Sequence, residues 1–477
     1  MADESIATTF RAGWELFHRT RRSAVAWGLL GTILRIIGGL IVLPLSARKL
    51  SSEHLGLWYV FLSLQGIATL FDLGFSPAVV RAAGYLWAGA RQLRAFGVEP
   101  IEQDKEAPSG PNYELLSHLV ATMRVYYRAL GSVSGLIMLV TGGAWIWYRT
   151  QTFADANTLR LCYAFFVVGG FLNVTGDLWP ALLSGVNGVQ SAQKILCGSA
   201  LINFLVTSIG LIAGLDIWAL ALGVIASGFF LRQAGRVSFA RLAGSSLSAG
   251  ATLKFGLIRK LWPIAWRTGF VSLGAFLVLS ANTLICSYLL DLKITASYGL
   301  SLTILTMLAT ASSTFTQVKL PIANQLRPEG RLSEIADIWI QRTRMSILAY
   351  VAGTTLVVFG LNFLLQLVGS HTPPLPRPQL ALACLICGLE MHHVLYAGLV
   401  ISENQNPFVA PALISGLATV ALSVILTPRL GVWGLLISQG IVQASFNNWW
   451  TVYRAIKGLG LSWSNYWHRY LRLPVRI

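Results

Sequence analysis

Charged residues are scarce in this sequence: only 12% of its 477 residues are Asp, Glu, Lys or Arg, whereas 55% are hydrophobic. A soluble protein of this length could build several domains. It would rarely do so with so few charges, because its surface would lack solvating groups. The apolar residues instead form repeated runs of about 20 residues, the length an α-helix needs to cross a bilayer. The sequence therefore predicts an all-α polytopic membrane protein.

Signatures of enzymes are also missing. The sequence contains no glycine-rich phosphate loop that ends in Lys-Ser or Lys-Thr, and no His-Glu-x-x-His. No segment between the apolar runs is long enough for a separate soluble catalytic domain. We therefore predict that the chain is not an enzyme, and we predict neither a cofactor nor a resident metal. Any energy that the protein uses would come from an ion gradient, the membrane potential or removal of its cargo.

Cysteine is rare, and its five copies all fall in apolar runs. Cys384 and Cys387 have the spacing of a redox motif, but they lie in the middle of a predicted membrane helix. We interpret them as small core residues.

Acidic residues are about half as frequent as basic ones, which gives a net charge of +17. We predict about twelve membrane spans, at 24–46, 55–78, 124–148, 160–186, 193–213, 216–236, 262–290, 294–322, 342–369, 378–402, 408–428 and 431–453. With a cytoplasmic N-terminus, the outer loops hold only Arg48, Lys49, Arg149, Arg160, Lys293, Arg377 and Arg429. This asymmetry is the positive-inside pattern, so we expect both termini in the cytoplasm and no nucleic-acid partner.

An internal repeat relates the two halves of the chain. Leu55–Gly66 (LGLWYVFLSLQG) is similar to Tyr298–Ala309 (YGLSLTILTMLA), and Glu114–Arg128 is similar to Gly330–Arg344. The spacing between these matches changes because the first half has a longer polar loop at Gly97–Asn112.

The repeat predicts two pseudo-symmetric six-helix lobes, residues 1–243 and 250–477, around a central cavity. Both halves start on the same side of the membrane, so they are parallel repeats. Such repeats commonly enclose a substrate path, as in transporters. The cytoplasmic segment 84–123 interrupts the first lobe.

Two stripes of polar residues recur at helical spacing within apolar runs. The first stripe consists of Gln65, Thr69, Asp72 and Ser76, and the second of Thr303, Thr306, Thr310, Ser313, Thr314 and Gln317. Lipid cannot satisfy such groups, so each stripe faces either a water-filled cavity or a neighbouring helix. Asp72 acts either in coupling or gating, or as a structural group near the inner interface that pairs with Arg81 or its neighbours.

A pair of acids lies deep in predicted spans. The repeat places Asp177 at the position equivalent to Glu390. Carboxylates inside a membrane are candidates for proton or cation coupling. His392, which follows Glu390, either relays protons or packs at an interface.

Arg35 is the one basic residue that lies well inside a predicted span. Arg267 lies near the cytoplasmic start of the seventh predicted span. Arg35 should point inward, because facing lipid would cost several kcal/mol. Guanidinium groups suit an anionic cargo, since they bind phosphate in a bidentate manner. The alternative for Arg35 is an internal salt bridge, for example to Asp177.

The stretch LSARKLSSEHLGLWYVFLSLQGIATLFDLGFSPAVVR, residues 45–81, resembles the start of bacterial polysaccharide-export proteins. LLSGVNGVQSAQKI, residues 182–195, resembles the same family. This family belongs to the multidrug/oligosaccharidyl-lipid/polysaccharide (MOP) flippase superfamily. The long loop after the second span departs from the compact pattern of the family.

The resemblance implies a flippase of the bacterial inner membrane, which moves a polyprenyl-pyrophosphate-linked oligosaccharide to the periplasmic leaflet by alternating access. It implies membrane lipids and the polysaccharide polymerase machinery as partners. Arg35, Arg267, Thr303, Thr306, Thr310 and Gln317 would bind cargo, and Asp72, Asp177, Glu390 and His392 would serve coupling or gating. A cation-coupled multidrug exporter of the same superfamily is the alternative. An integral-membrane glycosyltransferase or ligase would need a larger outer loop than His371–Pro378.

Overall fold

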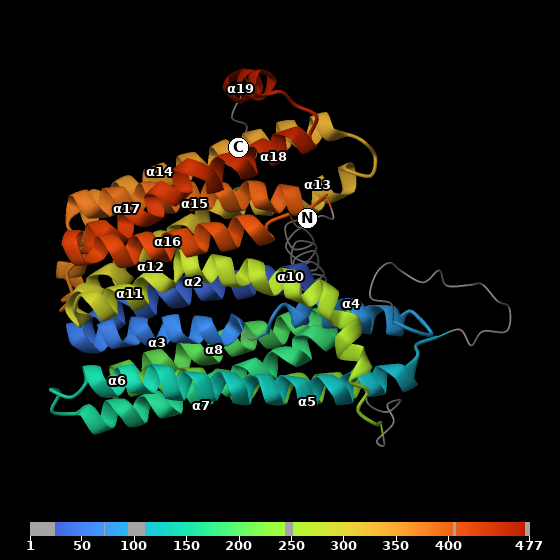
Figure 1. Cartoon of the computed structure of the whole chain (residues 1–477), viewed down its shortest axis with the longest axis horizontal. Coiled ribbons are helices and arrows are strands. Elements are labelled where there is room, and N and C mark those ends of the chain that lie inside the picture. The colour runs from blue at the N-terminus through green and yellow to red at the C-terminus, as the bar shows by residue number, and fades with distance from the viewer. Residues whose placement is uncertain (1–23, 71, 94–109, 244–250, 404–406, 473–477) are drawn as a thin grey trace, which may run out of the picture. The chain divides into compact units, whose positions relative to one another are not determined.

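The computed structural model describes residues 24–70, 72–93, 110–243, 251–403 and 407–472, and every regular element in these ranges is helical (Figure 1). The elements are α2 (Ala24–Lys49), α3 (Ser52–Leu70), α4 (Phe75–Trp87), α5 (Tyr113–Ile137), the π-helix η1 (Met138–Gly142), α6 (Gly143–Arg149), α7 (Ala156–Gly185), α8 (Val189–Ile212), α9 (Trp218–Ala243), α10 (Gly256–Leu279), α11 (Ala281–Leu289), α12 (Leu292–Gln317), α13 (Leu320–Leu326), α14 (Leu332–Val368), α15 (Arg377–Ile401), α16 (Val409–Leu430), α17 (Val432–Val442), the π-helix η3 (Gln443–Asn447), α18 (Asn448–Gly458) and α19 (Trp463–Arg472). Most of the polar loop predicted at Gly97–Asn112 lies outside the described residues.

Nine helices within the described ranges are long and apolar enough to cross a membrane. A tenth span is formed if the bent pair Gly256–Pro263 and Ala265–Leu279 is counted as one. These ten segments coincide with ten of the twelve predicted spans. The prediction of an all-α, multi-span membrane protein is therefore confirmed, whereas the remaining two predicted spans are not continuous α-helices.

The prediction of one helix over 55–78 is wrong, because α3 ends at Leu70 and α4 begins only at Phe75. Leu73 and Gly74 between them have φ angles of 48° and 74°, in the left-handed region that ends a helix. A Cβ at Gly74 would lie 2.5 Å from the carbonyl oxygen of Ala265, so the turn packs too closely for any other residue. The predicted polar face through Asp72 is thus interrupted, and the side chain of Thr69, which belongs to it, lies outside the described residues.

The predicted spans 262–290 and 431–453 are interrupted as well. The first bends by 57° next to Pro263, which removes a backbone donor, and it breaks again at Ser280 between α10 and α11. The second changes from α17 to the π-helix η3 and then to α18. A π-helical turn inserts an extra residue, so it shifts the direction in which the following side chains point.

The chain forms two compact units, one made of Met1–Val42 and Ile67–Gly269, the other of Leu43–Gly66 and Phe270–Ile477. We call them unit 1 and unit 2. The two-lobe division at residues 243–250, which was inferred from the repeat, stays a prediction.

In unit 1, α7 packs against α4, α5, α8 and α9. The α7–α9 contact is especially close. A Cβ at Gly228 of α9 would lie 2.7 Å from the Asn173 side chain of α7. Asn173 in turn donates a hydrogen bond across the interface to the Val224 carbonyl, at 3.1 Å. Small residues and interhelical hydrogen bonds are the usual means by which membrane helices associate.

In unit 2, α12 packs against α14 and α15, which also contact each other, and α16 packs against α17. The hydroxyls of Thr316 and Ser346 join α12 to α14 at 2.8 Å, and Tyr350 of α14 donates to the Cys384 carbonyl of α15 at 2.9 Å. All five cysteines are free and buried. These contacts fix the helices that line the cavity described next.

Candidate functional site

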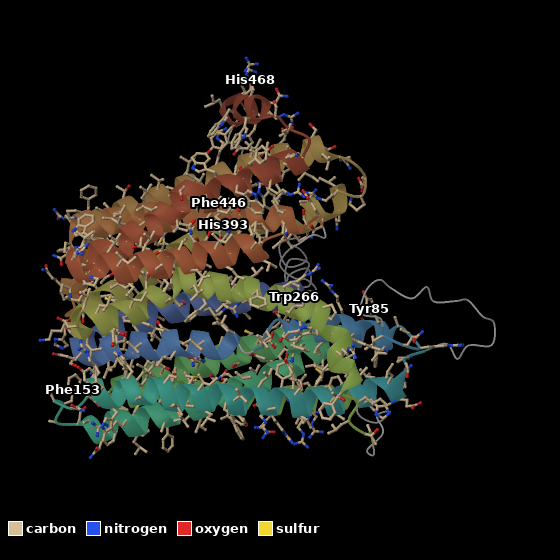
Figure 2. The ribbon with its side chains drawn as sticks, in the orientation of Figure 1. Tyr85, Phe153, Trp266, His393, Phe446 and His468 are labelled. Carbon is tan, nitrogen blue, oxygen red and sulfur yellow. The ribbon has the colours of Figure 1, made fainter. Side chains whose placement is uncertain are left out.

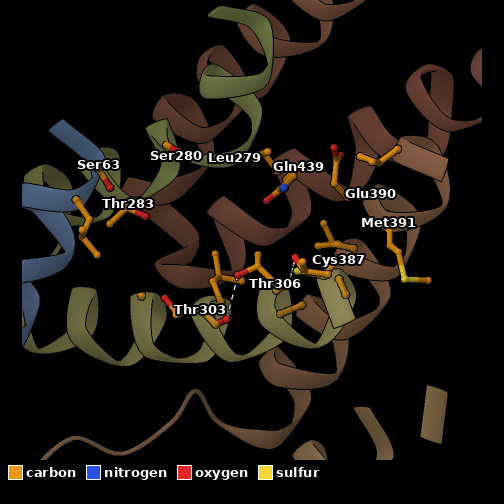
Figure 3. Close-up of a pocket in the computed structure, with 18 of the residues that line it drawn as sticks. Ser63, Leu279, Ser280, Thr283, Thr303, Thr306, Cys387, Glu390, Met391 and Gln439 are labelled. Carbon is orange, nitrogen blue, oxygen red and sulfur yellow. Dashed lines mark hydrogen bonds between the residues drawn. The ribbon is translucent and has the colours of Figure 1, made fainter. Parts of the chain in front are cut away.

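A cavity of about 430 Å³ lies within unit 2 (Figure 3). Residues of α3, α11, α12, α15 and α17 line it. Its size falls in the usual range for small-ligand pockets, and its lining combines apolar side chains with a few polar groups. Such a lining inside a membrane protein can hold a polar group that lipid cannot satisfy.

The threonine stripe of α12 lies on one wall of this cavity. Thr303, Thr306 and Thr310 all line it, as does Gln317. Thr306 donates its hydroxyl hydrogen to the Thr303 carbonyl at 3.0 Å, and Thr310 donates to the Thr306 carbonyl at 2.8 Å. Because these hydrogens are used within the helix, the hydroxyl oxygens retain the capacity to accept hydrogen bonds. This wall can therefore receive hydroxyl or amide donors of a ligand.

Glu390 of α15 also lines the cavity and brings a carboxylate to it (Figure 3). The side-chain amide of Gln443 donates a hydrogen bond to this carboxylate. Gln443 is the first residue of the π-helix η3, and Asn447 at its end donates to the Gln443 side chain at 3.2 Å. The irregular turn thus directs a chain of amides toward α15.

The same turn holds two histidines of α15. The Nδ1 atom of His392 forms a hydrogen bond with the Asn448 Oδ1 atom at 2.9 Å, and Nδ1 of His393 bonds the Asn447 carbonyl at 3.1 Å. Asn448 also donates to the Leu389 carbonyl at 2.5 Å. The predicted coupling residue His392 is therefore held by Asn448, which directly follows the amide chain of Glu390, Gln443 and Asn447. Its role in proton transfer stays a prediction.

Two amides of this network, Gln443 and Asn447, were not predicted from the sequence, nor was Gln439, which lines the cavity. Gln439, Gln443 and Asn447 follow one another at intervals of four residues, so they share one helix face. That spacing is the signal that could have identified them.

Unit 1 holds a second polar group, centred on Asp72. The Tyr127 hydroxyl donates to Asp72 Oδ1 at 2.6 Å, and the Ser76 backbone N–H donates to Oδ2 at 3.1 Å. Asp72 thus accepts hydrogen bonds at the start of α4, where a helix has unpaired N–H groups. Asp177 of α7 interacts electrostatically with Asp72, so the structure brings two of the predicted coupling acids close together. Their part in coupling or gating stays a prediction.

Both candidate arginines belong to unit 1. Arg35 is exposed on α2 and donates to the Thr32 hydroxyl of the same helix at 3.3 Å. Arg267 is exposed on α10, with its guanidinium carbon 5.6 Å from the centre of the neighbouring Trp266 ring. Cargo binding by either arginine stays a prediction.

Comparison with known proteins finds a distant sequence relative. No protein-family model matches the chain. Over 221 residues, 44% of this chain, it is 20% identical to a Shigella flexneri protein assigned to O-antigen transport. The match spans 47% of that protein, which is about half its length.

Solved structures match over nearly the whole chain. A multidrug resistance MATE family transporter of the MOP superfamily, in its inward-facing conformation, has a TM-score of 0.59 at 12% identity and matches over 91% of this chain and 95% of its own. The MATE multidrug transporter DinF-BH, solved in complex with a ligand, has a TM-score of 0.54 at 14% identity, over 93% of this chain and 97% of its own. A MOP superfamily transporter from Pyrococcus furiosus has a TM-score of 0.51 at 14% identity, over 93% and 98%.

The proteins named in these comparisons are transporters and not enzymes, as the sequence analysis predicted for this chain. At such low identity, the likeness to solved structures establishes the fold. This chain therefore has the fold of the MATE transporters of the MOP superfamily.

Proposed function

We propose that this protein is a flippase that moves a polyprenyl-pyrophosphate-linked oligosaccharide from the cytoplasmic to the periplasmic leaflet of the bacterial inner membrane. The observation that carries the proposal is the cavity among the helices of unit 2, one wall of which carries the threonine stripe. A sugar head group presents many hydroxyls, and the Thr306 and Thr310 hydroxyl oxygens can accept hydrogen bonds from them. The similarity to a protein assigned to O-antigen transport supports the same cargo class.

The pyrophosphate of such a cargo needs a cationic partner. Arg35 and Arg267 are our candidates, since a guanidinium stays charged and binds phosphate oxygens in pairs. Both side chains are exposed in the described structure, which leaves their guanidinium groups accessible.

The sequence has no phosphate loop for ATP, so the proposal draws its energy from an ion gradient. Glu390 is the best candidate for coupling, because it brings an ionisable group to the same cavity as the hydroxyl stripe. Proton or cation binding at Glu390 would then change the hydrogen bond from Gln443. We propose that Asp177, Asp72 and His392 assist in coupling or gating, in keeping with their sequence positions.

The proposed orientation has both termini in the cytoplasm. A group of arginines supports it: Arg124 of α5 interacts electrostatically with Arg128 of α5 and with Arg232 and Arg236 of α9. Basic residues are more frequent on the cytoplasmic side of a membrane than on the outer side, so we place this group of arginines there.

A second candidate function is a cation-coupled multidrug exporter. Two observations favour it: the Glu390 carboxylate in the cavity, which suits a cationic drug, and the multidrug transporters among the matching structures. One experiment separates the two. The purified protein is placed in vesicles with a defined polyprenyl-pyrophosphate sugar or with a cationic dye, and an ion gradient is imposed without ATP.

Our proposal expects the sugar head group to change leaflet and the dye to stay outside. Accumulation of dye without sugar movement would favour the exporter and overturn the flippase.

A further inference from the structure

The helix α19 (Trp463–Arg472) is not used by the transport proposal, yet it has the features of a membrane-binding element. It is seen nearly along its own axis in Figure 1, whereas α14 and α18 of the same unit run across the view. It therefore crosses the spans at a steep angle instead of extending one of them.

One side of α19 is fixed to the bundle of unit 2. Tyr466 is buried, and its hydroxyl lies 2.5 Å from that of Tyr396 on α15. The Trp463 ring stacks on Tyr453 of α18, with ring centres 6.5 Å apart. These aromatic contacts hold α19 against α15 and α18.

Contacts with α14 set the direction in which α19 faces. Arg469 donates to Asp337 at 2.8 Å and to the Ser333 hydroxyl at 3.0 Å, both in the first turns of α14. Tyr470 instead lies against Arg344, with the guanidinium carbon 5.5 Å from the ring centre. Because α14 rises about 1.5 Å per residue, Arg344 lies about 10 Å further along that helix than Asp337.

Trp467 and Leu471 point the opposite way from Arg469. Each is two residues from Arg469, and at 3.6 residues per turn this places both about 160° around the helix from it. Since Arg469 faces the first turns of α14, Trp467 and Leu471 point away from that charged end of α14. Both are exposed, Trp467 by 46% and Leu471 by 77%.

The later turns of α14 are an apolar surface. Leu348 and Val351, which follow Arg344, are more than half exposed. Since α14 has 37 residues and about 20 suffice to cross a bilayer, its first turns extend beyond the hydrocarbon. The level of α19 therefore coincides with the boundary between charged side chains and the lipid-facing part of α14.

We propose that α19 is an in-plane anchor that binds the lipid surface at this boundary. Trp467 and Leu471 enter the upper acyl region, as aromatic and apolar residues of interfacial helices do, and Asn465 and Arg472 stay among head groups and water. His468 points outward from the bundle, on the side away from Tyr466 (Figure 2). With the proposed orientation, the leaflet is the cytoplasmic one. The anchor does not depend on the nature of the cargo.

The test places a fluorescent label at single introduced cysteines in the full-length protein. Leu471→Cys probes the apolar side and Asn465→Cys, also exposed, is the matched control on the polar side. Trp467→Cys gives a second apolar position in case one variant fails to fold. The five native cysteines are buried, and the unmodified protein, labelled in parallel, measures their background.

The labelled proteins are placed in phosphatidylcholine and phosphatidylglycerol vesicles, with or without lipids brominated near the top of the acyl chains. The anchor predicts that brominated lipid quenches the label at 471 at least about twofold more than the label at 465, and that aqueous iodide gives the reverse order. If iodide quenches both positions equally, or brominated lipid quenches neither, α19 lies in water and the proposal is overturned.

Discussion

The side chain of Gln443 donates a hydrogen bond to the carboxylate of Glu390, and this bond joins the π-helical turn η3 to α15. Glu390 is at once a lining residue of the unit 2 cavity and a member of the amide network. A hydrogen bond to a charged group is about twice as strong as one between neutral groups. A change in the charge of Glu390 would therefore change the strength of the bond that holds η3, which continues directly into α18.

The hydroxyl stripe is expected to contribute to cargo affinity. The double variant Thr306→Val and Thr310→Val keeps the shape of the wall but removes two hydrogen-bond acceptors from the cavity. Each lost bond is worth about 0.5–1.5 kcal/mol, so the apparent KM for the sugar cargo should rise about tenfold, with little change in thermal stability. The apparent KM is obtained from flipping rates in vesicles at a series of cargo concentrations.

The matched control is Thr355→Val, whose exposed hydroxyl bonds the Val351 carbonyl of its own helix α14. An unchanged KM in the double variant, or an equal rise in the control, would remove the stripe from the binding site.

Asp72 is expected to stabilise unit 1 through Tyr127. Tyr127→Phe leaves one Asp72 oxygen without its 2.6 Å partner, and Asp72→Asn weakens the same bond. Each should lower the free energy of unfolding by about 1–3 kcal/mol. Together the two changes should cost less than their sum, because they remove one shared interaction.

Thermal unfolding of the two single variants and the double variant in detergent measures this coupling. Strictly additive losses would mean that the two side chains act independently.

The positive charge of Arg35 is expected to be needed for transport. Arg35→Ala should reduce surface-polymer output strongly at equal protein level, while Arg35→Lys should restore part of it, because an ammonium still attracts phosphate but cannot bind it in a bidentate manner. Immunoblots of the membrane fraction control for protein level. Undiminished output from Arg35→Ala would exclude it from the mechanism.

The pair of Glu53 and Lys293 predicts a pH dependence of stability. Burial raises the pKa of Glu53, but a backbone hydrogen bond and Lys293, 3.1 Å away, outweigh it, so the pKa lies below its ordinary value. The stabilisation is then fully present above the unfolded-state pKa of about 4.3, and it is lost as the pH falls through the lower folded-state pKa.

Both side chains are partly exposed, so solvent screening limits the pair to about 0.2–1 kcal/mol. Glu53→Gln should therefore lower the melting temperature slightly at neutral pH and leave it unchanged in acid. The same difference at both pH values would show that the charge of Glu53 contributes nothing.

The membrane spans could be predicted from the sequence because their length and apolar character are local properties. The breaks within the predicted spans 55–78, 262–290 and 431–453 could not be predicted. The turn at Gly74 depends on the close approach of Ala265, which is far away in the sequence. The π-helical turn at Gln443 places its amides against α15, and only the packed structure reveals that contact.

The candidate site was predicted in part. Thr303, Thr306 and Glu390 were chosen as polar residues in apolar helices, and the structure brings them to one cavity. Gln439 and Gln443 were missed, although their spacing of four residues places them on one face of the predicted span 431–453.

The most direct test of the account is a comparison of Glu390→Gln with the native protein in vesicles that contain a polyprenyl-pyrophosphate-linked sugar. Glu334→Gln, an exposed carboxylate that pairs with Arg331 at 2.7 Å, is the matched control. The account predicts that an imposed proton or sodium gradient accelerates head-group reversal by the native protein and by Glu334→Gln. The rate of Glu390→Gln should be at least about tenfold lower, a barrier increase of about 1.4 kcal/mol, and insensitive to the gradient. Equal, gradient-dependent rates in all three proteins would contradict the assignment of the unit 2 cavity as the coupled transport site.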